Sequence, residues 1–119
     1  MLFRSVKEAE SKLREAELTR INLKKGIELE VREAFYNLEA ISSAMEFYKK
    51  QVSFAEENYN TVFKQFTYGL ATNVDVIDVN STLVSAQESL ANSTIDLQVA
   101  ILELKRRMGV LLKEIDAEL

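Results

Sequence analysis

The sequence predicts an all-α protein that forms a long antiparallel coiled-coil helical hairpin without strands. The 119 residues include no proline and only three glycines, so most of the residues that interrupt helices and form strand turns are missing. Apolar residues recur at alternating steps of three and four in both halves of the chain. A short break around Gly69 separates the two periodic segments.

The first periodic segment predicts a helix over about residues 3–66. Its apolar residues follow a heptad pattern, which lines one side of a helix for packing against a partner helix. This first seam comprises Ile27, Val31, Ala34, Leu38, Ile41, Met45, Tyr48, Val52, Ala55, Tyr59, Val62 and Phe66. The aromatic residues of the segment lie largely on or beside the seam, and we interpret them as packing residues.

An earlier register precedes the first seam. It runs through Leu2, Val6, Ala9, Leu13, Ala16 and Leu23. The two registers are out of phase near Gly26. A stutter that locally unwinds the supercoil would explain this shift, and a tolerated exposed glycine would explain it equally well.

The second periodic segment predicts a helix over about residues 74–108. The second seam comprises Val76, Val79, Leu83, Ala86, Leu90, Ser93, Leu97, Ala100, Leu104 and Leu111. Three cations at residues 105–107 and the glycine at 109 are typical of a helix C-terminus, so we expect the helix to end near Met108. The tail, residues 109–119, either continues as helix or frays.

The break between the helices, residues 67–73, is the tip of the hairpin. Gly69 can adopt the left-handed conformation that ends many helices. Thr72 or Asn73 can cap the next helix, and Thr72 with Asp75 three residues later matches the capping-box pattern. The unequal helices leave roughly the first 20 to 25 residues without a partner in the chain. Because a two-helix hairpin buries little surface, we expect other helices to pack on it.

The charge is distributed unevenly. The formal net charge is −4, and residues 67–98 account for all of it, because they hold four acidic residues and no cation. Either this is a solvated helix face with a capping aspartate, or the segment lines a wet passage that attracts cations. Copies of Asp75 and Asp78 arranged around an axis would form acidic rings, which select cations in pores.

The composition excludes several functions. Without histidine or cysteine, zinc and most other transition-metal sites are not expected, and the usual general base is missing. No phosphate loop or nucleophile–base pair is visible, so we predict no enzyme, no catalytic residue and no cofactor. The negative charge and the lack of a basic patch argue against nucleic-acid binding. No stretch is long and apolar enough to span a bilayer as a helix, and nothing resembles a signal peptide.

Several motifs together resemble the TolC-like outer-membrane efflux channel family. They are "AFYNL" at residues 34–38, aromatic residues before "YGL" at 68–70, "DVID" at 75–78, "LVSAQESL" at 83–90, and the leucine and glycine of "LKRRMG" at 104–109. The resemblance covers about residues 27–110. The family has two such repeats per chain, and "DVID" is more similar to the second, C-terminal one.

The resemblance implies a trimeric channel whose periplasmic helices form a tunnel below an outer-membrane barrel. The segment would be a periplasmic part of that tunnel, and a fragment beginning at an added Met1. The tunnel mouth would face an inner-membrane pump, and the tip would dock on a periplasmic adaptor protein. The adaptor-contacting residues would be Tyr68, Gly69, Leu70, Ala71 and Thr72. Asp75 and Asp78 match the aspartates that ring the closed entrance.

Two positions depart from the family pattern. Ala71 replaces a gating arginine, and Phe66 replaces its associated tyrosine, so a polar lock built from those groups is not expected here. Two alternatives to the channel segment remain open from the residues alone: a coiled-coil scaffold or dimerisation hairpin without a transport role, and the hairpin of an adaptor protein. On its own, the fragment is expected to self-associate in a non-native way.

Overall fold

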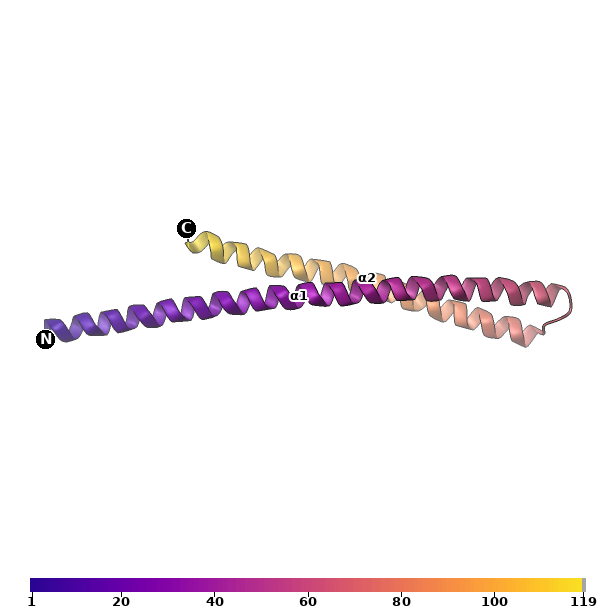
Figure 1. The fold of residues 1–119 in the computed structure, drawn as a ribbon, viewed down its shortest axis with the longest axis horizontal. Coiled ribbons are helices and arrows are strands. Elements are labelled where there is room, and N and C mark those ends of the chain that lie inside the picture. Colours follow the sequence, from indigo (N-terminus) through magenta and orange to yellow (C-terminus); the bar gives the residue numbers. More distant parts are fainter. Residues whose placement is uncertain (119) are drawn as a thin grey trace. The chain divides into compact units, whose positions relative to one another are not determined.

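The computed structural model describes residues 1–118, which form two helices (Figure 1). Helix α1 spans Leu2–Thr67 and helix α2 spans Asn73–Glu118, and the described residues contain no strand. The prediction of an all-α helical hairpin is therefore confirmed. Neither helix, within the described residues, contains an apolar stretch long enough to cross a membrane.

The hairpin consists of two compact units. The tip unit is Asn37–Leu102, and it holds the tip with the adjoining parts of both helices. The terminal unit combines Met1–Tyr36 of α1 with the part of α2 that begins at Glu103. Within the tip unit, α1 and α2 run antiparallel from the tip (Figure 1).

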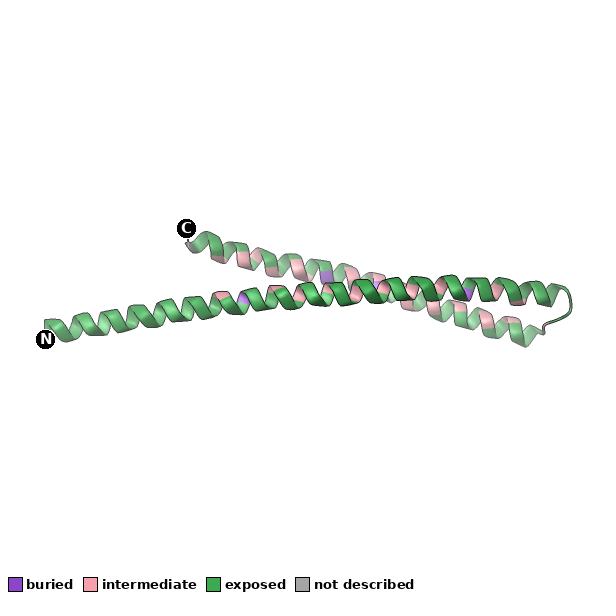
Figure 2. Ribbon diagram, in the orientation of Figure 1, coloured by how far each residue is buried: buried purple, intermediate pink, exposed green. Residues whose placement is uncertain are grey.

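The two predicted seams are the contact surfaces between the helices. All residues of the first seam from Ile27 to Val62, and all residues of the second seam, are buried or half-buried (Figure 2). Small residues recur every seven positions on α2, and two of them are among the most buried side chains: Ser93 is 6% exposed and Ala100 is 3% exposed. Small side chains let the helix backbones approach closely, so the core is thin.

Phe66 departs from the predicted seam because it is exposed. It lies in the last turn of α1, and α2 starts only at Asn73, so no layer of α2 faces it. Its ring instead approaches that of Phe63, with 6.3 Å between the centroids. Of the other aromatic residues, Tyr48 and Tyr59 pack on the seam, but Phe47 and Phe54 are mostly exposed. The interpretation as packing groups agrees with the burial of Tyr48 and Tyr59, and for Phe47 and Phe54 it stays a prediction.

Residues 1–23 are exposed throughout (Figure 2). This agrees with the expectation that the start of the long helix is not covered by the second helix of the chain. From Lys24 onward, half-buried or buried positions follow at Ile27 and Val31, in the same phase as the rest of the first seam. The residues of the earlier register are exposed, and their phase relative to a partner helix is not tested, so the stutter near Gly26 stays a prediction.

The expected end of α2 near Met108 is wrong, because the helix continues to Glu118. Gly109 lies inside the helix and does not take a positive φ. A glycine within a helix costs only about 1 kcal/mol relative to alanine, and no proline follows to stop the helix. Leu111 keeps the seam pattern beyond the glycine and is half-buried. Leu119, the last residue of the predicted tail, lies outside the described residues.

Candidate functional site

The C-terminus of α1 closes in a Schellman motif, which produces the turn at the tip. Gly69 has a φ of 77°, in the left-handed region that favours glycine. The N–H of Gly69 donates to the carbonyl of Phe66 at 3.0 Å, and the N–H of Leu70 donates to the carbonyl of Gln65 at 2.8 Å. These two bonds satisfy carbonyls that the helix end leaves without helical partners. The prediction that Gly69 ends the helix in a left-handed conformation is confirmed.

The N-terminus of α2 is held by a capping box between Thr72 and Asp75. The backbone N–H of Asp75 donates to the Thr72 hydroxyl oxygen at 3.2 Å, and the N–H of Thr72 donates to the Asp75 carboxylate at 2.9 Å. The Thr72 hydroxyl also donates to that carboxylate, at 3.0 Å. Of the two caps that the sequence allowed, Thr72 and Asn73, the structure shows Thr72.

These hydrogen bonds stabilise the charged form of the Asp75 carboxylate. The Thr72 backbone N–H, followed by the Thr72 hydroxyl, lowers the pKa of Asp75 below its ordinary value. Because the folded pKa is lowered, the carboxylate contributes stability at pH values above its unfolded pKa of about 3.9. That contribution is lost as the pH falls through the lower folded pKa.

We expect Thr72→Ala to destabilise α2 by about 1 kcal/mol at neutral pH, because the cap loses its side-chain acceptor. Below pH 3.9 the difference from the unmodified chain should shrink as Asp75 is protonated. Urea unfolding followed by circular dichroism at pH 7 and at several values below 4 measures both effects. Thr82→Ala is the matched control, because the Thr82 hydroxyl donates only to the Asp78 carbonyl inside the helix, at 3.1 Å. A loss of stability in Thr72→Ala that does not change with pH would contradict the assigned role of the carboxylate.

The predicted adaptor-contacting residues form a small exposed surface at the tip. Tyr68 is 77% exposed and Leu70 is 80% exposed, whereas Ala71 is half-buried. Gly69 and Thr72 shape the backbone of this surface through the turn and the cap. An apolar and aromatic surface with this exposure can bind another protein, although single exposed apolar residues are also normal on protein surfaces.

Asp75 and Asp78 begin a polar stripe along one side of α2. Each member of the stripe directly precedes a seam residue, so the members share one side of the helix. The polar stripe consists of Asp75, Asp78, Thr82, Ser85, Ser89, Asn92 and Asp96. The lack of cations in this segment is visible in the sequence, and the seam positions of α2 are the signal from which this alignment can be found.

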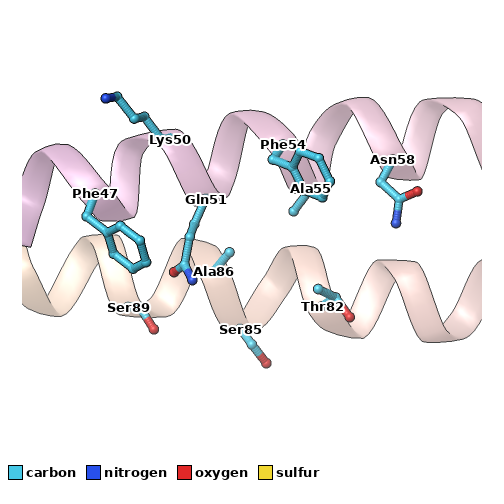
Figure 3. A pocket seen from close by; sticks show the side chains of 10 residues that line it. All are labelled: Phe47, Lys50, Gln51, Phe54, Ala55, Asn58, Thr82, Ser85, Ala86 and Ser89. Carbon is cyan, nitrogen blue, oxygen red and sulfur yellow. The ribbon is translucent and has the colours of Figure 1, made fainter.

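The polar stripe borders a groove that could not be predicted from the sequence, and Thr82, Ser85 and Ser89 of the stripe line it. It has a volume of about 580 Å³ and lies in the tip unit, between residues 47–58 of α1 and residues 82–89 of α2 (Figure 3). The α1 side presents the rings of Phe47 and Phe54, and the α2 side presents Thr82, Ser85 and Ser89. Figure 3 shows the Phe47 ring pointing toward α2 and the Lys50 side chain pointing away from it.

An ion-pair network crosses between the helices of the terminal unit. The Arg107 guanidinium bonds to Glu30 of α1 and, through Nε at 2.8 Å, to Glu103 of α2. Arg106 also contacts Glu103 at 2.9 Å. Arg106 and then Arg107 lower the pKa of Glu103, while Glu103 and then Glu30 raise the pKa of Arg107. Sequence reasoning missed this network because Arg107 stands at a seam position, between Leu104 and Leu111, where apolar residues are the rule.

The chain matches the family of outer membrane efflux proteins over residues 3–110, a range that contains the tip and most of both helices. It is 32% identical over 81 residues to the outer membrane protein TolC of Escherichia coli (strain K12), and equally to that of Salmonella enteritidis. The alignments cover 68% of this chain but only 16% of each relative. No solved structure matches the chain significantly. Because the family match spans the whole hairpin as far as residue 110, the chain belongs to the outer membrane efflux protein family.

Proposed function

We propose that the chain is a periplasmic tunnel segment of an outer-membrane efflux channel. The observation that carries this proposal is the family match over residues 3–110, which includes the tip and most of both helices. The relatives are much longer than this chain, so the hairpin would be one part of a larger protein. The proposed role is the passage of solutes and includes no catalysed reaction.

The exposed surface of the hairpin supports its place in a larger helical assembly. The accessible surface is 9512 Å², whereas a globular protein of 13.6 kDa exposes roughly 6,600 Å². Exposed apolar residues occur along both helices, including the start of α1, where no partner helix is present in the described chain. In a tunnel these surfaces would be covered by neighbouring helices of a homotrimer, with the barrel part of the channel in the outer membrane.

The tip unit would provide the tunnel mouth. Asp75 and Asp78 from each copy would ring the entrance, where their exposed carboxylates attract cations. Tyr68 and Leu70 would contact a periplasmic adaptor protein that links the channel to an inner-membrane pump. Because Ala71 and Phe66 carry no polar group in their side chains, the entrance would close through other groups than an arginine–tyrosine lock.

The family match favours a channel segment over the two alternatives, a cytosolic scaffold and the hairpin of an adaptor protein. The full-length protein, reconstituted in a planar lipid bilayer, tests the proposal. We expect discrete single-channel currents that multivalent cations block from the side of the tip. A protein that inserts into the bilayer but carries no such current would refute the channel function and bring the scaffold hypothesis forward.

A further inference from the structure

The groove on the tip unit combines a bulky wall with a small one. Phe47 and Phe54 of α1 are 58% and 74% exposed, so a large apolar area remains uncovered in the hairpin. The opposite wall, on α2, carries the short side chains of Ser85 and Ser89 (Figure 3). A surface with a ridge on one side and a depression on the other can pair with a copy of itself, provided that the ridge of each meets the depression of the other.

Only one orientation of two copies brings these walls together. A twofold axis along the hairpin keeps both tips at the same end and places α1 of each copy over α2 of the other. Phe47 and Phe54 then face the small wall of the second copy. A twofold axis across the hairpin would place α1 over α1, so that the phenylalanines would meet each other and the serines would meet each other.

The charges at the edges of the groove favour the same orientation. Lys50 lines the groove and points away from α2 (Figure 3), and Glu88 directly precedes Ser89, which lines the groove from the other side. Lys50 therefore lies on the outer edge of α1 and Glu88 on the outer edge of α2, at the same height along the hairpin. Within the described residues, neither side chain makes an ion pair. With the tips at one end, Lys50 of each copy would lie beside Glu88 of the other.

The exposed area leaves room for such a partner. The chain exposes about 2,900 Å² more than a globular protein of its mass would, and a standard protein interface buries about 1,600 Å² in total. Pairing through the groove would cover the exposed phenylalanines and produce a four-helix arrangement, in which thin two-helix cores are commonly completed.

We propose that the free chain forms a twofold-symmetric dimer through this groove, with both tips at one end and Lys50–Glu88 contacts on both edges. This inference does not depend on the proposed channel function, because it concerns the free chain only. The occupant of the groove is a second copy of the chain. The phenylalanines fit against the small wall at the centre of the interface, and Lys50 and Glu88 pair at its edges.

Sedimentation equilibrium of the purified 119-residue chain at micromolar concentrations tests the dimer. We expect a monomer–dimer equilibrium. Lys50→Glu and Glu88→Lys should each weaken the dimer affinity by about tenfold or more, because each change places two like charges side by side at both edges of the dimer. The combined variant with both changes should recover the original affinity. Lys49→Glu is the control: it changes the net charge equally, but Lys49 pairs with Glu46 and lies on the opposite face of α1.

Spin labels on Tyr68→Cys test the orientation, since the chain has no other cysteine. The groove lies about 25 Å from the tip by helix rise, so opposed hairpins would place the two labels about 50 Å apart. Tips at the same end would place them much closer. A monomeric chain, a dimer that is insensitive to both charge reversals, or labels about 50 Å apart would each overturn the proposal. If the chain is monomeric, the groove would instead be covered by a different helix of the longer protein.

Discussion

Replacing Asp75 and Asp78 together by Asn in the full-length channel is expected to relieve its block by divalent and trivalent cations. Each copy contributes two exposed carboxylates at the tip, and no cation occurs in the sequence between Lys64 and Lys105. A mouth lined by one sign of charge concentrates counter-ions by about tenfold or more, so its loss should raise the blocking concentration by a similar factor. Single-channel conductance, titrated with cation on the tip side, measures this change.

Two control variants separate the charge of Asp75 from its role as a cap. Thr72→Ala removes the two hydrogen bonds of the Thr72 hydroxyl but keeps both carboxylates, so cation block should persist. Asp96→Asn removes a carboxylate of the polar stripe about 27 Å further along α2 than Asp78, and it should affect block less. If the double variant is blocked like the original channel, the two aspartates act only in the local structure of the tip.

Ala100→Leu should give the largest loss of hairpin stability. Ala100 is 3% exposed on the second seam, so three added carbon atoms have no space between the helices. Inserting such groups into a packed core costs about 1–3 kcal/mol, which is a large fraction of the stability of a thin hairpin. Urea unfolding of the free chain, monitored by circular dichroism at one fixed protein concentration, gives the change in free energy.

Ala91→Leu provides the matched control on the same helix. Ala91 is exposed, so the same substitution adds no atoms to the seam. Both alanine and leucine are strong helix formers, and the control should unfold within about 0.5 kcal/mol of the original chain. Equal stabilities for Ala100→Leu and Ala91→Leu would mean that the helices separate without cost at Ala100, contrary to its burial.

The seams could be predicted because a heptad repeat depends on residues close together in the sequence. Val31 through Val62 and Val76 through Leu104 follow the three–four spacing, and their burial agrees with it. Local sequence rules were also sufficient to predict the left-handed conformation of Gly69 and the capping box of Thr72 and Asp75. They were misleading near Met108, since a cation run and a glycine can also lie inside a continuing helix.

Features that depend on both helices could not be predicted in the same way. Arg107 and Glu30 are 77 positions apart, and their contact depends on how the two helices align. The groove between Phe54 and Ser85 likewise requires knowledge of which sides of α1 and α2 share a face. For the candidate site, the sequence predicted the turn and the cap, and the assignment of Asp75 and Asp78 to a tunnel mouth stays a prediction.

The contact between Glu30 and Arg107 bears on how the chain selects one alignment among several similar ones. A seam that repeats every seven residues looks nearly the same after one helix slides by seven positions along the other. Sliding by that step would move Arg107 from Glu30 to Leu23 or to Asn37. Neither of these side chains carries a carboxylate that could pair with the guanidinium. The tip prevents such sliding in its own unit, and the charged contact opposes it in the other. The ambiguity of a repetitive sequence is thus resolved at two separate places by residues that break the repeat.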